Sequence, residues 1–362
     1  KFYDEIELLA QRRLLKLFSN SGTGWVVNVQ PYSGSPANLA VYNALMNPGD
    51  TLMGMFLPAG GHLTHGHKVN FSGRIYKSVQ YGVDSETGLL DYTAIEKLAE
   101  EHRPRVIVSG YTAYPRKVDF ERMGTIAKKN GAFYMADISH EAGLIAAGLL
   151  PSPFKYADVV TTTTHKTLRG PRAAVILCKE EYQERINRSV FPGMQGGPHN
   201  NVIAAIALMA FEDQQASFKK YQKQVLKNAI VLAETLKLFQ PKADPPLAEN
   251  FKLLTDGTDN HMMLIDLKTI PEMDGKKAQN LLEEGGIVVN RNSIPGDTSP
   301  FNPTGVRLGT PAVTSRGMKE KEMRQIGQWF KRILINKEKP AVIKKEVESL
   351  CSRFPLTYKN SL

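Results

Sequence analysis

The feature that most constrains the fold of this chain is a regular alternation of strand-like and helix-like stretches between about residues 25 and 200. Runs of β-branched and apolar residues such as RVIVSG, AFYMAD and AAVILC are typical of buried strands. Between them, ANLAVYNALM has a helical pattern, and ERMGTIAKKNG is typical of a helix closed by glycine. Because such alternation produces a mainly parallel sheet with helices on its faces, the sequence predicts an α/β fold.

The remainder of the chain predicts a second, smaller domain. A long helical tract over residues 200–239 is followed by QPKADPPLAEN, whose prolines and polar residues indicate a boundary. After it, HMMLIDL, KKAQNLLEEGG, IVVN and GVRLGT predict a small α/β domain that ends in amphipathic helices. We therefore expect a large domain over residues 1–242 and a small C-terminal domain over residues 243–362.

Composition argues against several classes of protein. A hydrophobic fraction of 42% with 23% charged residues is ordinary for a globular chain and argues against disorder. No apolar run reaches the roughly 20 residues that a membrane helix needs, and the N-terminal KFYDEIELLAQRRLLKLF predicts a helix within a domain, not a signal peptide. Cys178 and Cys351 have no nearby partner in the sequence, which favours a reducing compartment, the cytoplasm ahead of the mitochondrion.

The net charge of +10 raises the question of nucleic-acid binding. The basic residues are dispersed among acidic ones, and the sequence has no basic stripe interleaved with aromatic residues. We therefore expect no nucleic-acid partner and interpret the charge as a basic surface that attracts an anionic small-molecule substrate. RNA binding through that surface stays open as an alternative function from another class.

The stretch TTTTHKTLRGPR, Thr161 to Arg172, predicts a reactive lysine at the end of a strand. Lysine amines form Schiff bases with carbonyl compounds, and enzymes that use pyridoxal phosphate pair such a lysine with an aspartate. Asp137 ends the preceding strand, with His140 three residues later, so parallel strands would deliver Asp137 and Lys166 to one edge. A solvated lysine and a helix-capping aspartate are the plainer interpretations.

Two further segments point to a phosphorylated, flat cofactor. In PYSGSPANLAVYNALM, Ser33, Gly34 and Ser35 begin a predicted helix, where unpaired amides attract a phosphate; an ordinary N-cap explains the pattern equally well. In PAGGHLTHGHKVNFSG, three histidines at short spacing suggest zinc. Because the sequence has no HExxH signature, we expect no metal and favour stacking of His62 on the cofactor.

Nine segments, taken in order, resemble the serine hydroxymethyltransferase family over essentially the whole chain. They are YSGSPAN, GGHLTHG, VNFSG, YGVD, TTTTHKTLRGPR, FPGMQGGP, GTDNHMMLIDL, NRNSIPGD and GVRLGTPAVTSRG. The resemblance implies a fold-type-I pyridoxal phosphate enzyme, a transferase that moves a one-carbon unit reversibly from L-serine to tetrahydrofolate and yields glycine and 5,10-methylenetetrahydrofolate. A threonine aldolase-type lyase, which needs the same lysine and acid without a folate pocket, is the alternative among enzymes.

The resemblance implies a catalytic role for each matching residue. Lys166 would carry pyridoxal 5'-phosphate as an aldimine, and His165 would stand beside it. Asp137 would pair with the pyridinium nitrogen, and His62 would stack on the ring. His140 would hydrogen-bond to the cofactor hydroxyl or to the substrate carboxylate.

Binding roles follow from the same resemblance, which implies a homodimer or homotetramer with an active site shared across the interface. The residues expected to bind the cofactor are Ser33, Gly34 and Ser35 at the phosphate, with Thr112, Thr163 and, from across the interface, Gly196. Those expected to bind the substrates serine, glycine and tetrahydrofolate are Arg307 at the amino-acid carboxylate and Leu57, Leu63 and Asn292 in the pteridine pocket.

Two departures from the family pattern stand out. In the family, a stretch that would precede residue 1 holds a tyrosine and a glutamate that reach the active site, and neither has a match in this chain. We therefore expect a chain that lacks the family's N-terminal segment. Thr112 stands where some members have serine, a change that keeps the hydroxyl group.

Overall fold

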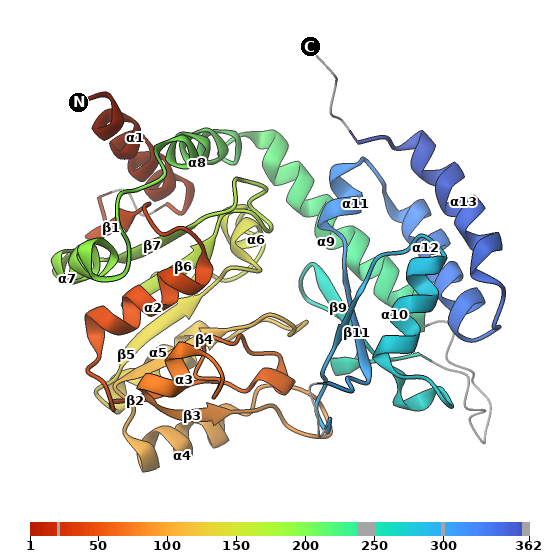
Figure 1. Cartoon of the computed structure of the whole chain (residues 1–362), viewed down its shortest axis with the longest axis horizontal. Helices are drawn as coiled ribbons and strands as arrows, with labels where there is room; N and C mark the ends of the chain where they lie inside the picture. The colour runs from red at the N-terminus through yellow and green to blue at the C-terminus, as the bar shows by residue number, and fades with distance from the viewer. Residues whose placement is uncertain (20–21, 238–250, 298–300, 357–362) are drawn as a thin grey trace. The chain divides into compact units, whose positions relative to one another are not determined.

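The chain folds into two compact units (Figure 1). The structure is a computed structural model that describes residues 1–19, 22–237, 251–297 and 301–356. The domain boundary expected at residues 242 and 243 lies outside the described residues and stays a prediction. The first unit comprises Lys1–Val83, Leu90–Thr112 and Lys117–Gln222, and the second comprises Asp84–Leu89, Ala113–Arg116 and Lys223–Leu362.

A seven-stranded sheet forms the centre of the described part of the first unit, with the strand order β1-β7-β6-β5-β4-β2-β3. The neighbours from β6 to β3 are parallel, whereas β7 runs antiparallel to both β6 and β1. The predicted α/β fold with a mainly parallel mixed sheet is confirmed. The strands are β1 (Trp25–Asn28), β2 (Thr51–Met55), β3 (Lys77–Tyr81), β4 (Val106–Gly110), β5 (Phe133–Asp137), β6 (Val159–Thr163) and β7 (Ala174–Lys179).

Helices cover both faces of this sheet. Ala37 and Val41, on one side of the helix α2, pack into a core with Met135 of β5. On the opposite face, the helix α5 packs against the ring of Tyr134, and Gly124 in this helix leaves room for the backbone and Cβ atom of Tyr156. The side chains of Met135 and Tyr134 point to opposite faces because successive residues of a strand alternate. The helices of this unit are α1 (Phe2–Leu17), α2 (Gly34–Leu45), α3 (Phe71–Ile75), α4 (Tyr92–His102), α5 (Phe120–Lys129), α6 (Ala142–Ala146), α7 (Gln183–Arg188), α8 (Asn200–Glu212) and the first part of α9 (Ala216–Lys237).

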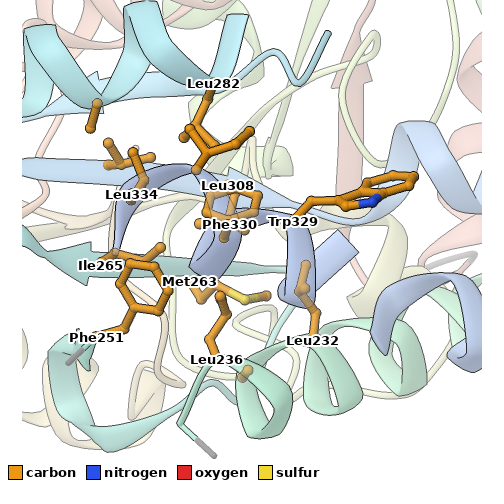
Figure 2. Close-up of a cluster of buried hydrophobic side chains, with 14 of the residues drawn as sticks. Leu232, Leu236, Phe251, Met263, Ile265, Leu282, Leu308, Trp329, Phe330 and Leu334 are labelled. Atoms are coloured by element: carbon orange, nitrogen blue, oxygen red, sulfur yellow. The ribbon is translucent and has the colours of Figure 1, made fainter. Parts of the chain in front are cut away.

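The second unit has a small antiparallel sheet with the order β10-β11-β9-β8, packed against helices. Its core joins the rest of α9 to the sheet and to α12, as Figure 2 shows for Leu232, Met263 and Phe330. The elements are β8 (Lys252–Leu253), β9 (Met262–Asp266), α10 (Gly275–Glu284), β10 (Asn290–Asn292), β11 (Gly305–Gly309), α11 (Pro311–Ser315), α12 (Glu320–Leu334) and α13 (Pro340–Arg353).

Two sequence expectations differ from the observed elements. The predicted helical tract over residues 200–239 is interrupted, because α8 ends at Glu212 and α9 begins at Ala216. The side-chain amide of Gln214 donates to the backbone oxygens of Ala210 and Arg13, so the polar turn is held by side-chain bonds in place of helical ones. The segment IVVN contributes only Asn290 to a strand. No helix in the described part of the chain is long and apolar enough to cross a membrane.

The core of the second unit generates a prediction for stability. Phe330→Ala should lower the free energy of unfolding by about 3–5 kcal/mol, because it removes a ring that is 1% exposed and leaves a cavity. Urea unfolding measures the change. Phe301→Ala, the same truncation at a side chain that is 85% exposed, is the control and should cost less than about 0.5 kcal/mol. Equal losses in the two variants would contradict the assigned core.

Candidate functional site

Three neighbouring parallel strands end at the same edge of the first sheet. Gly110 of β4 lies opposite Asp137 of β5, and Asp137 lies opposite Thr161 of β6. Ligands of open α/β sheets bind outside these carboxyl ends. A cavity of about 200 Å³ lies here. It is lined by Ser33, Gly34, Ser35, Asn38, His62, Tyr111, Thr112, Asp137, Ser139, Thr163, His165, Lys166 and Arg172.

Asp137 is the buried acid of the cavity, and several groups donate hydrogen bonds to it. The amide nitrogen of Asn38 lies 2.8 Å from its Oδ2, and Nε2 of His65 lies 3.2 Å from the same oxygen. The backbone N–H of Ser139 donates to Oδ1 at 3.1 Å. Both carboxylate oxygens therefore have donors, although Asp137 is only 9% exposed.

These contacts determine the charge of Asp137. Burial alone would raise the pKa of this carboxyl, but the hydrogen bond and charge of His65, together with the bond from Ser139, outweigh burial. The pKa of Asp137 consequently lies well below its usual range. The cavity contains a carboxylate that stays ionised at neutral pH.

Asn38 connects this carboxylate to its surroundings. The residue lies on α2 and is 1% exposed. Its Nδ2 also donates to Oγ1 of Thr64 at 2.9 Å, and its Oδ1 accepts from the hydroxyl of Thr161 at 2.8 Å. One amide thus joins α2, the loop that carries the histidines and the strand β6. The position of Asp137 depends on side chains from elements far apart in the sequence.

The histidine segment provides one ring at the cavity and one beneath it. Nδ1 of His62 lies 2.8 Å from the hydroxyl of Thr64. Burial, followed by the charge of His65, lowers the pKa of His62 to about 4, so its ring is neutral at neutral pH and suits stacking on a flat ligand. His65 instead faces Asp137. Within the described residues, no three histidine, cysteine, aspartate or glutamate side chains are grouped to hold a metal ion.

Lys166 lies in a loop that begins where β6 ends. Bonds between Thr164 and the segment 170–173 close this loop, the shortest running from the Thr164 hydroxyl to the backbone oxygen of Pro171 at 2.6 Å. His165 precedes the lysine, and its buried Nδ1 has no hydrogen-bond partner among the described residues. Burial, together with the positive charges of Arg172 and Lys166, lowers the pKa of His165.

The start of α2 forms the opposite wall of the cavity. Ser33 is the N-cap in an extended conformation, and within the described residues its side chain makes no capping bond, so the first amides of the helix are available to a ligand. A Cβ atom built at Gly34 would lie 2.8 Å from Cγ2 of Thr163, so glycine permits this close approach. The arrangement is typical of a phosphate-binding helix start.

The residues around this cavity fit pyridoxal phosphate. A helix start and two serines are available for a phosphate, a neutral imidazole for the ring face and an ionised aspartate for a ring nitrogen. Nδ1 of His165, which has no hydrogen-bond partner in the described part of the chain, is a further polar atom that a ligand would satisfy. A lysine amine beside them matches the aldehyde of this cofactor.

Not every predicted residue lines the cavity. His140 does not, and its backbone oxygen accepts from Thr167 at 3.0 Å. Gly196 lies in a segment that the side chain of Gln195 ties to the amide of Tyr32, next to the phosphate-binding segment. The remaining predicted residues outside the lining of this cavity are Leu57 and Leu63 of the first unit and Arg307 and Asn292 of the second.

Several side chains of the site escaped the sequence analysis. Asn38, Tyr111, Ser139 and Arg172 line the cavity, although no role was expected for them. His65 was weighed only as a zinc ligand. The sequence did contain a signal for Asn38. An asparagine inside an apolar helix is unfavourable unless its amide group has buried hydrogen-bond partners.

Comparison with known proteins gives one consistent result. A family model described as "Serine hydroxymethyltransferase" matches residues 1–330. A serine hydroxymethyltransferase of Legionella pneumophila (strain Corby) is 51% identical over 362 residues, which cover 98% of this chain and 83% of that protein. A serine hydroxymethyltransferase of Koribacter versatilis (strain Ellin345) is 50% identical over 360 residues, which cover 98% and 81%.

The hydrogen bonds of Asn38 lead to a prediction. Asn38→Ala should lower the free energy of unfolding by about 2–4 kcal/mol, because Asp137 and two threonines lose a buried partner. Asn43→Ala on the same helix is the matched control; Asn43 is exposed and bonds only Ser189 among the contacts described, so its loss should stay below about 1 kcal/mol. Chemical denaturation at pH 7 compares them, and similar losses would refute the central role of Asn38.

Proposed function

The chain belongs to the serine hydroxymethyltransferase family, and from this membership we propose how its site works. Its function is that of a serine hydroxymethyltransferase, a transferase that acts in serine and glycine metabolism. We propose that its cofactor is pyridoxal 5'-phosphate and that tetrahydrofolate is its one-carbon acceptor. The observation that carries this proposal is the meeting of Lys166 and the ionised Asp137 at one cavity.

The proposed cofactor supplies chemistry that amino-acid side chains lack. When bound, pyridoxal phosphate offers an electron-withdrawing ring that stabilises the carbanion left when a bond to the amino-acid α-carbon breaks. Asp137 would hold a proton at the ring nitrogen, and the neutral imidazole of His62 would stack on the ring. Lys166 would form the covalent attachment, with His165 beside it.

The remaining cofactor contacts are proposed on the same basis. Ser33, Gly34 and Ser35 would bind the phosphate through the start of α2, which carries a partial positive charge. Thr112 and Thr163 would contact the cofactor, and both line the cavity. His140 would hydrogen-bond to the cofactor hydroxyl or to the substrate carboxylate.

Arg307 is the proposed clamp for the carboxylate of the amino acid. It lies in β11 of the second unit, opposite Leu264 of β9. Burial lowers the pKa of its guanidinium, but an arginine stays charged in proteins. Two parallel hydrogen bonds to a carboxylate fix its orientation as well as its affinity. Which bond at the α-carbon breaks depends on that orientation.

Assembly and the folate pocket are further parts of the proposal. We propose a homodimer or homotetramer in which Gly196 reaches the phosphate of the neighbouring copy. Exposed apolar side chains on α1 and α8, among them Phe2, Leu8 and Leu208, support a buried contact with a second copy. Leu57, Leu63 and Asn292 would line the pteridine pocket.

The compartment is proposed from the cysteines. Cys178 is buried, Cys351 is partly buried, and both are free thiols. Burial raises the pKa of Cys178 to about 12, so its thiol is inert. A reducing compartment suits such a protein, and we favour the cytoplasm over the mitochondrion.

The lysine assignment gives a direct test of the proposed function. Lys166→Arg should keep the fold but lower the steady-state conversion of serine to glycine by at least about 10³-fold, because guanidinium does not form the covalent attachment. The assay measures glycine with and without tetrahydrofolate, and circular dichroism monitors the fold. Lys128→Arg on the exposed surface of α5 is the control and should leave the rate unchanged. Normal turnover by the Lys166 variant would refute the assignment.

A second test concerns the carboxylate clamp. Arg307→Ala should raise the KM for serine by about 10²-fold with a smaller change in the KM for tetrahydrofolate, because a charge-assisted bidentate contact is lost. Arg307→Lys should recover little, since lysine lacks the planar fork. Arg291→Ala, an exposed arginine on the neighbouring strand β10, serves as the control. An effect on the folate KM alone would assign Arg307 to another site.

A further inference from the structure

A second carboxyl group lies buried beside the cavity, and the proposed reaction does not use it. Glu141 follows His140 and immediately precedes α6, and it is only 2% exposed. Its Oε2 accepts a hydrogen bond of 2.5 Å from the hydroxyl of Tyr111. Its other oxygen, Oε1, is buried and has no hydrogen-bond partner within the described residues.

Tyr111 connects this carboxyl to the cavity. It is 5% exposed, lies directly after β4 and lines the cavity next to Thr112. The bond between Tyr111 and Glu141 therefore ties the segment after β4 to the segment after β5. Each segment follows a strand, and the two strands pair side by side and end at the proposed cofactor site. A change at Glu141 reaches the cavity through one phenol ring.

The surroundings of Glu141 favour its neutral form. Burial raises its pKa most, the hydrogen bond from Tyr111 opposes this rise, and the negative charge of Asp137 adds to it, so the pKa of Glu141 is raised to about 7. The titratable groups that act on Glu141 or respond to its charge are Tyr111 after β4 and Asp137 and Tyr134 of β5. The hydroxyl of Tyr134 is itself bonded to Ser109 at 2.7 Å.

We propose that Glu141, held by Tyr111, is a positioning residue whose ionisation determines how much negative charge acts on a ligand in the cofactor cavity. When Glu141 is neutral, Asp137 is the anion beside the ring, and an anionic phosphate ligand binds. When Glu141 is ionised, a second negative charge lies behind Tyr111 and weakens the binding of that ligand. The inference rests on the proposed function, because it concerns the phosphate of the proposed cofactor.

The electrostatic argument has two steps. In a buried site, charges act over several ångströms with little screening by water or salt, so a second carboxylate near Asp137 raises the free energy of a bound phosphate. Among the residues that the structure describes, Oε1 of Glu141 has no donor to neutralise its charge, unlike either oxygen of Asp137. The charge of Glu141, once formed, is therefore felt by its neighbours.

A non-covalent probe separates this effect from the chemistry of Lys166. Pyridoxine 5'-phosphate keeps the ring and the phosphate but lacks the aldehyde, so it forms no bond with the lysine amine. Its dissociation constant is measured by calorimetric titration of the full chain freed of cofactor, from pH 6 to pH 9. The titration of the probe itself cancels when variants are compared at each pH.

Glu141→Gln is the principal variant, because an amide keeps an acceptor for Tyr111 and cannot ionise. At pH 6 the unchanged chain and the variant should bind equally, since Glu141 is then neutral. At pH 8.5 the variant should bind about threefold to tenfold more tightly, because Glu141 of the unchanged chain loses its proton as the pH rises through about 7. Parallel profiles from pH 6 to pH 9 would overturn the proposal.

Tyr111→Phe gives an independent readout. Removing the hydroxyl abolishes the bond that lowers the pKa of Glu141, so the loss of probe affinity should begin at a higher pH than in the unchanged chain. This variant decides the question if the glutamine variant does not fold, and an unshifted profile would count against the proposal. Glu121→Gln is the matched control, because Glu121 bonds Tyr156 at 2.9 Å on the exposed surface, and its profile should not change.

The two proposals fail differently. If the unchanged chain binds no probe at any pH, the cofactor site itself is refuted. If all chains bind the probe with the same pH profile, the cofactor site stands and the role of Glu141 is refuted.

Discussion

The parallel pairing of β4, β5 and β6 is the constraint on which the site depends. Because the three strands run in one direction, their carboxyl ends meet at one edge, and Gly110, Asp137 and Thr161 stand opposite one another there. The lysine loop leaves the last of these strands, and α2 meets the same edge through Gly34. A register shift of one residue would turn Asp137 away from the cavity, since alternate side chains face opposite sides of a strand.

Burial of a charge at this edge requires polar partners, and these come from distant parts of the chain. Asp137 stays ionised because an asparagine of α2, a histidine of the loop after β2 and a backbone amide donate to it. Each donor is in turn fixed by another contact, as when Asn38 accepts from Thr161. Removing water from a carboxylate is tolerated only when such bonds replace it. The cavity and the stability of the first unit are therefore linked through the same few groups.

The sequence predicted what local patterns encode and missed what packing decides. Continuous apolar and β-branched runs located β4 and β5, and the residues at strand ends led to Asp137 and Lys166. The pairing of Asn38 with Asp137 spans 99 residues, and no local pattern reports it. Likewise, the break between α8 and α9 depends on where the amide of Gln214 finds acceptors. For Gly196, Arg307 and the folate residues, the resemblance to the family remains the basis of their proposed roles.

The contrast between Asp137 and Glu141 explains how one edge of a sheet holds two buried carboxyl groups. Both are nearly inaccessible to water, yet burial leaves the pKa raised only at Glu141, whereas the contacts of Asp137 lower its pKa. Asp137 has donors at both oxygens, whereas Glu141 has a phenol at one oxygen and no partner in the described structure at the other. The number of donors, more than burial, therefore decides which group is the anion. Because like charges near each other disfavour double ionisation, the ionised Asp137 helps to keep Glu141 neutral.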